Sequence, residues 1–144
     1  ACYRTVTIAR FRDRQSGQEF LYLNTHLDHV GKAARTEGVK LIVNSLKESS
    51  IAGNVPVVVG GDMNSTIEDK IFQRFYDANL KPARELTKKT NHVDTYNAYG
   101  KEPSALIDHF FVRNVKVKQF RTLDGNYGVP YISDHYPIEM VIGL

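Results

Sequence analysis

The first part of the chain has two stretches rich in apolar and β-forming residues, separated by a polar segment. Residues 3–12 and 19–25 show this pattern, and the polar segment 13–17 between them ends in a Ser-Gly pair that is typical of turns. The pattern predicts a β-hairpin whose second strand runs directly into the polar residues 24–29.

A helical period follows from about Ala33 to Lys47. Its apolar residues recur at the spacing i, i+3, i+4 and i+7, which lines one face of a helix: Val39, Ile42, Val43 and Leu46. Arg35 lies four residues before the first of these, on the same face. The pattern predicts an amphipathic helix with one cation on its apolar side.

An almost entirely apolar run at 55–59 predicts a strand that is covered on both faces, with Gly60-Gly61 ending it. Ser65 and Glu68 have the spacing of a capping box, which predicts that a second helix starts there. That helix would point three apolar side chains inward: Ile71, Phe72 and Phe75.

The polar residues 81–104 predict a long surface excursion. Three more strands are predicted after it, at residues 107–112, 115–123 and 138–142. The second of them alternates and turns Lys116 and Lys118 outward. The order of these elements predicts a mixed α/β layered sandwich.

Composition narrows the class of protein. With 144 residues, 42% hydrophobic and 24% charged, the chain is expected to form a single globular domain with its own core. No run of about 18 apolar residues is present, so no membrane segment is expected. One cysteine excludes an internal disulfide, and the compartment is left open. The net charge of +3 favours a polyanionic partner only weakly.

The chain starts at Ala1 without an initiator methionine, inside a stretch that already has the pattern of a strand. We therefore expect residues 1–144 to be the C-terminal portion of a longer domain.

Four short segments share one design, in which an apolar strand meets Asp, Asn or His at its end. They are NTHLDH at 24–29, GGDMNS at 60–65, IDHFFV at 107–112 and SDHYPI at 133–138. In layered α/β proteins the functional groups gather at strand ends, so these four segments are predicted to converge on one site.

Each segment also has an ordinary structural interpretation. Asp62 and Asn64 suit an Asx turn, and the segment around His135 suits a cap. His26 and His29 could be satisfied edge histidines, and Arg35 could extend its charge to solvent. A buried carboxylate such as Asp108 needs a partner, because an unpaired buried charge costs several kcal/mol.

Taken together, the segments supply the parts of phosphate ester chemistry. That chemistry needs a carboxylate to position water, donors for the phosphoryl oxygens and a hard cation with oxygen ligands. Asp62, Asn64, His26 and His135 offer the first two, and Asp134 offers a metal ligand. Asp108 is the natural partner to orient His135, since a histidine beside a carboxylate keeps its charged donor form at higher pH.

In order and in strand context, the four segments resemble the C-terminal half of the endonuclease/exonuclease/phosphatase superfamily, which has the DNase I-like fold. The resemblance covers nearly the whole chain and includes two further elements, Arg35 in the helix after the first segment and Thr95-Tyr96-Asn97 before the third. It implies a fold that is part of a four-layer α/β sandwich, with mixed β-sheets flanked by helices.

The resemblance implies hydrolysis of a phosphate ester by in-line attack of water, assisted by Mg²⁺ or by Mn²⁺ in its place. Asp62 would orient or deprotonate the water, and Asn64 would hold phosphoryl oxygens. His135, oriented by Asp108, would stabilise the developing charge. Further groups complete the implied site: His26 at a phosphate oxygen, Asp134 at the metal, and His29 and Arg35 in supporting positions.

The family also binds its metal through an Asn on the first strand and a Glu soon after it, and both precede the region of Ala1. We therefore expect these residues alone to hold an incomplete metal site. We also expect the uncovered sheet face to favour association with the missing N-terminal half or dimerisation.

The leading hypothesis is a metal-dependent phosphoesterase acting on nucleic acid or on a small phosphoester. Two alternatives stay open. One is a binding or scaffold module of the same fold that lacks catalysis. The other is a zinc hydrolase that would use four residues: His26, His29, Asp62 and His135.

Overall fold

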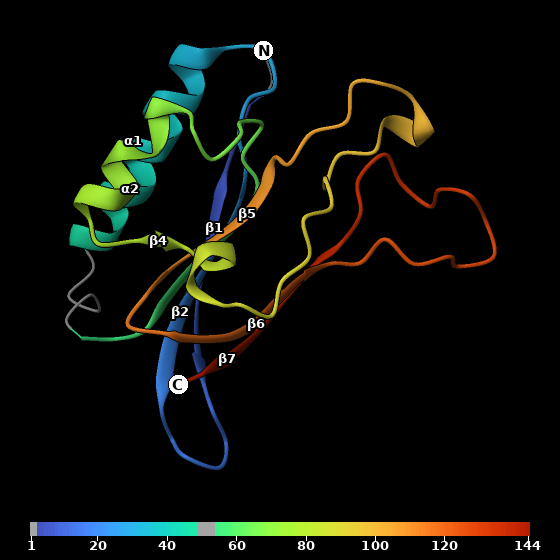
Figure 1. Ribbon diagram of the computed structural model, residues 1–144. Coiled ribbons are helices and arrows are strands. Elements are labelled where there is room, and N and C mark those ends of the chain that lie inside the picture. Colours follow the sequence, from blue (N-terminus) through green and yellow to red (C-terminus); the bar gives the residue numbers. More distant parts are fainter. Residues whose placement is uncertain (1–2, 49–53) are drawn as a thin grey trace.

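The computed structural model describes residues 3–48 and 54–144, and these form three layers (Figure 1). Two helices lie on one face of a five-stranded mixed sheet, and a two-stranded sheet packs on its other face. The mixed α/β class is confirmed, and the layers match part of the expected four-layer sandwich. Residues 1 and 2, where the strand-like start of the chain begins, lie outside the described part.

The predicted hairpin is confirmed. Strand β1 (Val6–Arg12) pairs antiparallel with β2 (Glu19–His26). The Asp13 carboxylate accepts backbone N–H bonds in the turn, and Gly17 takes a positive φ of 72° there.

The predicted first helix is also confirmed, as α1 (Lys32–Glu48). Its four apolar side chains are buried against the sheet. Helix α1 connects β2 to β3 (Val57–Asp62), which lies parallel to β2, as a strand–helix–strand unit requires.

The prediction that Gly60-Gly61 ends this strand is wrong, because β3 continues to Asp62. The glycines serve close packing instead. A Cβ on Gly61 would lie 1.9 Å from the carbonyl oxygen of Thr25, and one on Gly60 would lie 2.5 Å from the ring of Phe110. The two glycines thus let neighbouring strands approach at the end of the sheet where the polar segments meet.

The capping-box prediction is wrong in position. The 3₁₀ turn η1 (Lys70–Phe72) and helix α2 (Gln73–Asp77) begin later, and Asp69 caps the turn by accepting the N–H of Ile71. The expected inward side chains are buried all the same: Ile71, Phe72 and Phe75. The start is thus set by Asp69, whose carboxylate satisfies a free N–H of the first turn.

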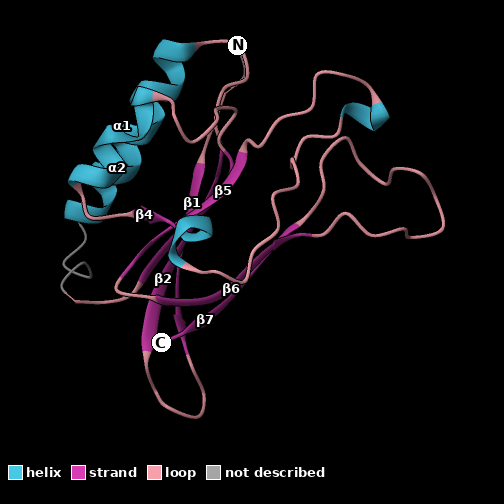
Figure 2. Cartoon of the chain, viewed as in Figure 1, coloured by secondary structure: helices cyan, strands magenta, loops and turns pink. Residues whose placement is uncertain are grey.

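The remaining strands complete the two sheets (Figure 2). The short β4 (Lys81–Pro82) and β5 (Asp108–Arg113) extend the first sheet in the order β1-β2-β3-β5-β4. Strands β6 (Lys116–Thr122) and β7 (Ile138–Gly143) form the second. Lys116 and Lys118 are exposed, as predicted.

The core has two parts, one on each face of the first sheet. The part under the helices contains the larger aromatic residues, with Phe72, Phe75 and Phe111 fully buried and in ring contact. The part between the sheets is smaller and centres on Val58, Val112 and Phe120. Phe120 also lies under the Arg84 guanidinium, 4.4 Å from its carbon to the ring centroid.

The long surface excursion was only partly predicted. It contains the turns η2 (Ala83–Leu86) and η3 (Ala98–Gly100) and is mostly irregular. Its middle is not on the surface, however, because Thr95 and Asn97 are buried. Among the described residues, no helix has the length and apolarity needed to cross a membrane.

Candidate active site

Three strands of the first sheet bring their polar ends together. His26 ends β2, Asp62 ends β3 and Asp108 begins β5, and the register pairs His26 with Asp62 and Asp62 with Asp108. Since β5 runs antiparallel to β3, its first residue lies beside the last residue of β3. Sheet topology thus collects groups that are far apart in the sequence.

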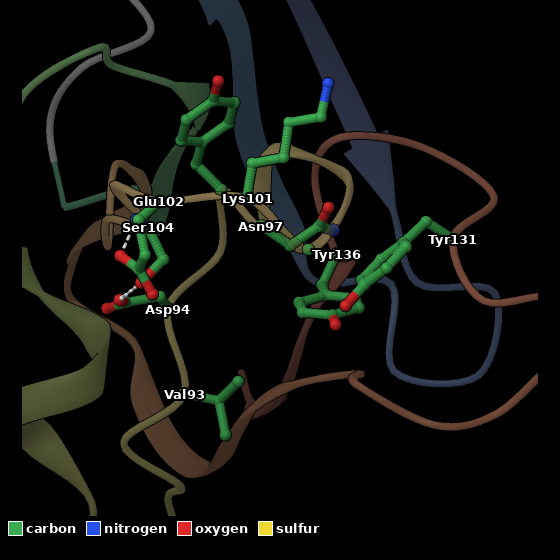
Figure 3. A pocket seen from close by; sticks show the side chains of 10 residues that line it. Val93, Asp94, Asn97, Lys101, Glu102, Ser104, Tyr131 and Tyr136 are labelled. Atoms are coloured by element: carbon green, nitrogen blue, oxygen red, sulfur yellow. Dashed lines mark hydrogen bonds between the residues drawn. The ribbon is translucent and has the colours of Figure 1, made fainter.

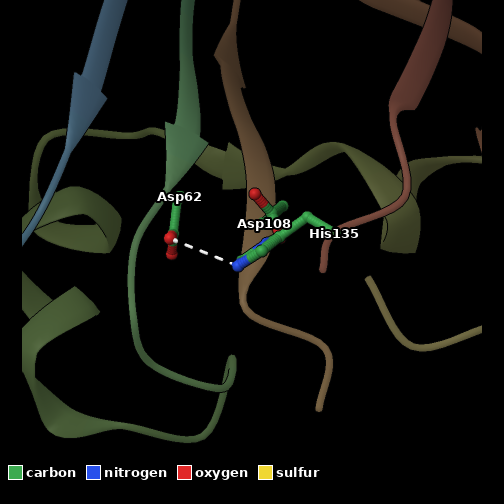
Figure 4. A group of neighbouring side chains, drawn as sticks. All are labelled: Asp62, Asp108 and His135. Atoms are coloured by element: carbon green, nitrogen blue, oxygen red, sulfur yellow. Dashed lines mark hydrogen bonds and ion pairs between the residues drawn. The ribbon is translucent and has the colours of Figure 1, made fainter. Parts of the chain in front are cut away.

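The fourth segment adds His135 to this edge (Figure 4). His135 Nδ1 lies 2.7 Å from Asp108 Oδ2, and its Nε2 lies 3.8 Å from Asp62 Oδ2. The expected contact between Asp108 and His135 is therefore present. A carboxylate can only accept, so Nδ1 carries a hydrogen and Nε2 faces the second carboxylate.

The segment 95–97 holds the last two motifs in place. The Thr95 hydroxyl oxygen accepts the N–H groups of Ile107 and Asp108 at 3.1 and 3.0 Å. The carbonyl of Thr95 accepts the N–H of Tyr136 at 2.7 Å, and the Tyr96 ring packs on His135 at 5.1 Å between centroids. The segment 95–97, which we call the clamp, therefore links the start of β5 at Asp108 to the residues around His135.

Asn97 extends this clamp. Its side-chain amide donates to the carbonyl of Ser133 at 3.1 Å, and its backbone N–H donates to the carbonyl of Asp134 at 2.7 Å. No periodic pattern in the sequence predicts this burial, because two isolated polar residues in a polar stretch are typical of a loop. The resemblance to the family includes both residues.

Asp62 and Asn64 form the predicted Asx turn and also lie at the site. The Asn64 N–H donates to Asp62 Oδ1 at 2.8 Å, with Asn64 at a φ of 47°. The Asn64 side-chain amide donates to the carbonyl of Leu27 at 2.9 Å and to Asp62 Oδ2 at 3.3 Å. The structural and functional interpretations of this pair are therefore compatible.

His26 lies at the rim of the site. Its Nε2 is 3.1 Å from Asp62 Oδ2, and its side chain is 56% exposed, compared with 13% for Asp62. An imidazole in this position can reach an incoming ligand without leaving its carboxylate partner.

His29 and Arg35 are not in direct contact with this cluster. His29 is exposed, and its Nδ1 lies 3.2 Å from an Arg4 guanidinium nitrogen. Arg35 donates to the carbonyl of Asp28 at 3.0 Å and is half-buried rather than extended to solvent. It therefore fastens the loop that follows His26 to the start of α1.

Asp28 is a member of that loop whose role the sequence did not reveal. It is buried, and its carboxylate accepts the N–H groups of Val30 and Gly31 at 2.8 and 2.6 Å. These bonds shape the turn before α1.

Asp134 is partly buried beside His135 in the sequence. Its carboxylate accepts from the Ser133 hydroxyl at 3.3 Å, and the Ser133 hydroxyl in turn accepts the N–H of His135 at 3.2 Å. The predicted cap at this segment is thus a short turn closed by Ser133. The backbone on either side is fixed by Asn97, so Asp134 has a defined position.

Electrostatics single out Asp62. Burial is the largest cause that raises the pKa of this carboxyl, and the nearby charge of Asp108 raises it further. The Asn64 N–H and the two histidines His26 and His135 act in the opposite direction. The net rise means that the fold holds the charged form of Asp62 at a cost.

The arrangement can accept a cation. Asp62, Asp108 and His135 place one ligand atom each within 4.8 Å of one another. In the described part of the chain, the ion pairs of the two carboxylates are with histidines, not with Lys or Arg. Two close carboxylates without a fixed cation fit a divalent metal with oxygen ligands. The zinc set expected as an alternative is not assembled here, since His29 contacts Arg4 instead.

His109 is a buried residue next to the site that the sequence reasoning overlooked. Its Nε2 lies 2.9 Å from the carbonyl of Ser65, so this nitrogen carries the hydrogen and donates. Burial is the main cause that lowers the pKa of His109. The Phe72 ring meets it edge-on at 5.8 Å, so the loop after Asp62 is anchored to the aromatic core. A histidine inside an apolar strand was the available signal.

Solved structures share this architecture. An endonuclease/exonuclease/phosphatase from Bacteroides vulgatus is 32% identical, with a TM-score of 0.88 over 99% of this chain and 56% of that one. A mannosyl-6-phosphatase from Bacteroides thetaiotaomicron is 28% identical, with a TM-score of 0.86 over 98% of this chain and 57% of that one.

A beta toxin from Staphylococcus aureus, whose structure contains magnesium ions, shares the fold alone. It is 17% identical, with a TM-score of 0.73 over 95% of this chain and 57% of that one. The chain thus spans a little over half the length of these structural neighbours. Comparison with curated proteins gives no significant match.

The family model described as "Endonuclease/Exonuclease/phosphatase family" matches residues 2–135, which contain the four polar strand ends as far as His135. This match covers most of the chain. The chain belongs to the endonuclease/exonuclease/phosphatase family.

Proposed function

We propose that the protein is a metal-dependent phosphoesterase that cleaves its substrate by in-line attack of water. The observation that carries the proposal is His135, whose two ring nitrogens face the carboxylates of Asp108 and Asp62 at 2.7 and 3.8 Å. This geometry places a candidate base, Asp62, beside an oriented hydrogen-bond donor, His135, on the same sheet edge.

Asp62 is proposed to position the attacking water and to take its proton. The raised pKa of Asp62 supports this role, since a general base works best when its pKa lies near the pH at which the enzyme operates. The close carboxylate Asp108 is already occupied by His135 and is therefore assigned a positioning role.

His135 is proposed to stabilise the negative charge that develops on the phosphoryl group. Its contact with Asp108 fixes the ring orientation and leaves Nε2 directed toward Asp62, where the phosphoryl group is proposed to bind. The Tyr96 ring restricts the remaining freedom of the imidazole. Preorganisation of this kind reduces the reorganisation required during the reaction.

Asn64 and His26 are proposed to hold phosphoryl oxygens. The Asn64 amide now donates to Leu27 and Asp62, so binding a phosphoryl oxygen requires it to release the longer bond to Asp62, at 3.3 Å. His26 requires no such exchange, because its side chain is largely exposed. His29 and Arg35 support the loop that follows His26.

A divalent cation, Mg²⁺ or Mn²⁺, is proposed at the carboxylate edge, with Asp134 as a ligand. The carboxylates of Asp62 and Asp108, which with His135 place ligand atoms within 4.8 Å of one another, add favourable negative charge at this edge. Such a cation neutralises charge on the phosphoryl oxygens when it is bound. Further ligands, an Asn and a Glu, are expected upstream, with residues 1–144 forming the C-terminal portion of one longer domain.

The substrate class is proposed as a phosphomonoester or phosphodiester. The 28% identical structure is named for a mannosyl-6-phosphatase, which supports a small phosphorylated substrate. A neighbour at 17% identity was solved with a single-strand DNA product, so a nucleic acid is the other substrate of the proposal. The net charge of +3 is compatible with either.

The test uses the full gene product that contains these residues. Hydrolysis of bis-aryl phosphate, aryl phosphate and single-stranded or abasic DNA is measured with Mg²⁺, with Mn²⁺ and with excess chelator. We expect turnover that the chelator abolishes and that Asp62→Ala reduces by a factor on the order of 10²–10⁴. Turnover that persists with chelator, or full activity of Asp62→Ala, would overturn the mechanism. Tight binding without turnover would favour the non-catalytic binding module.

A further inference from the structure

A small cavity opens beside His135, on the segment that leads into the last polar motif. Its volume is about 220 Å³. We call it the tyrosine pocket and define it by six of the residues that line it: Tyr127, Val129, Tyr131, Ile132, His135 and Tyr136. Because His135 also faces Asp62, the pocket and the carboxylate edge share one wall.

The chemistry of this lining is unusual for a phosphate-binding protein. Aromatic, aliphatic and proline side chains dominate it, and His135 is its only basic group. It contains no Lys, Arg, Asp or Glu. A second phosphate placed there would lack the cations that polyphosphates and nucleic acids require. The pocket therefore selects an uncharged group.

The size of the cavity limits that group to one ring. An apolar cavity of about 150 Å³ accepts benzene, whereas drug-sized ligands fill roughly 300–1,000 Å³. A volume of about 220 Å³ lies between these values, so a single six-membered ring with substituents fits. The rings of Tyr131 and Tyr136, with centroids 6.4 Å apart and planes tilted by 39°, provide an aromatic wall for it.

A second cavity of about 340 Å³ is lined by the same two tyrosines (Figure 3). Its lining is polar and includes Asp94, Lys101 and Glu102. Figure 3 shows Tyr131 and Tyr136 grouped at one side of this cavity, away from the Asp94 side chain. Of the two cavities that share these tyrosines, the tyrosine pocket is the apolar one, so an uncharged ring is more favourable there.

Building on the proposed function, we propose that the tyrosine pocket holds the uncharged ring of a phosphoester while its phosphate lies against Asp62 and His135. The substrate would then be the ester of a single ring-bearing alcohol, either a sugar or an aryl alcohol, rather than a polynucleotide or a polyphosphate. Both kinds of ring present an apolar face to an aromatic wall.

The test compares matched substrates on the full gene product. The value of kcat/KM is measured for methyl phosphate, phenyl phosphate and a hexose 6-phosphate, and for the methyl and phenyl diesters. We expect the ring-bearing esters to exceed their methyl counterparts by at least about tenfold, a factor typical of filling an apolar pocket. The hexose and phenyl arms distinguish the two sources of the ring.

Ile132→Asp introduces a charge into the pocket at an exposed position, where folding is little affected. We expect it to lower the ratio of ring to methyl kcat/KM by about tenfold or more. Leu41→Asp is the matched control, since Leu41 is exposed on α1, outside the tyrosine pocket. The control should leave the ratio unchanged.

A binding measurement separates this inference from the proposed function. NMR signals of Tyr131 and Tyr136 are followed as phenyl phosphate or inorganic phosphate is added. Shifts caused by phenyl phosphate alone support the pocket even if no ester is hydrolysed. Hydrolysis with equal ratios in the wild type and in Ile132→Asp, or a preference for oligonucleotides over single-ring esters, would overturn the inference while leaving the proposed phosphoesterase intact.

Discussion

At the scale of single residues, Asp62 shows the conflict between stability and chemistry most clearly. Burial and the charge of Asp108 raise the pKa of Asp62, so the folded state binds its proton more tightly than the unfolded chain does. The stability contributed by this group therefore falls as pH rises from the ordinary Asp pKa, about 3.9, to the raised value. At neutral pH the full cost is present.

Asp62→Asn removes this titrating charge and keeps an oxygen that can accept the Asn64 N–H. We expect a higher Tm than wild type at pH 8, and a difference that shrinks toward pH 4, together with loss of hydrolysis. Thermal unfolding at several pH values measures the difference in Tm between the variant and the wild type. Asp124→Asn, an exposed carboxylate outside the cluster, should leave the Tm unchanged. A lower Tm for Asp62→Asn at pH 8 would contradict this view of the site.

At the scale of elements, the clamp at 95–97 decides whether the polar strand ends meet. Thr95→Val leaves the N–H groups of Ile107 and Asp108 without their acceptor. We expect a loss of about 1–3 kcal/mol in the free energy of unfolding and a lower kcat. Urea unfolding and steady-state kinetics measure the two effects.

Thr95→Ser is the matched variant, because it keeps the hydroxyl oxygen. It should recover most of the stability and of the kcat that Thr95→Val loses. If Thr95→Val keeps the wild-type stability and Thr95→Ser loses it, the methyl packing of Thr95 matters and the two hydrogen bonds do not.

His109 gives the loop after Asp62 its own pH dependence. Burial lowers the pKa of His109, so the unfolded chain binds this proton more readily than the fold does. Stability from this group is present above the ordinary His pKa of about 6.5 and is lost as pH falls below it. Wild type should therefore lose stability between pH 7 and pH 5.

His109→Gln keeps a donor for the Ser65 carbonyl and cannot titrate. We expect this variant to be less stable at pH 7, because the ring contact with Phe72 is lost. Its unfolding free energy should change less between pH 7 and pH 5 than that of wild type. Parallel slopes for the two proteins would show that the histidine does not determine the effect.

Sequence reasoning succeeded where a periodic pattern fixes an element. The stripe Val39 to Leu46 gave α1, and the alternation around Lys116 gave β6. It failed where contacts between distant residues set the end or the start of an element. Strand β3 continues through Gly61 to Asp62, and the helical turn starts after Asp69 and not after Ser65. The local propensities of the residues predict neither the close packing at Gly61 nor the cap at Asp69.

The same distinction applies to the site. The contact between Asp108 and His135 could be predicted, because a carboxylate in an apolar strand needs a partner. The burial of Thr95 and the anchoring role of His109 could not, since both depend on which strands become neighbours. Register determined them, and register is a property of the assembled sheet.

At the scale of the whole molecule, the first sheet has an apolar area near β1 that is not fully covered. Phe11 is 48% exposed and stacks on Phe20 with ring centroids 5.3 Å apart. Exposed aromatic area of this kind favours contact with another polypeptide. The expected association with an N-terminal half, or with a second copy, would cover it.

For residues 1–144 expressed alone, we expect Phe11→Thr to weaken self-association, because threonine suits a strand and removes the aromatic face. Sedimentation velocity over a range of concentrations measures it. Leu41→Thr on α1 serves as the control and should associate as wild type does. Equal association of Phe11→Thr and wild type would place the interface elsewhere.

The proposed hydrolysis requires Asp108 and His135 to act as one unit beside Asp62. The most direct measurement is a double-mutant cycle in kcat/KM for aryl phosphate hydrolysis by the full gene product, using Asp108→Asn, His135→Gln and the double variant. We predict that each single change lowers kcat/KM by a factor on the order of 10²–10⁴ and that the double variant is no worse than the more damaged single variant. Losses that multiply in the double variant, or a single variant with wild-type kcat/KM, would contradict it.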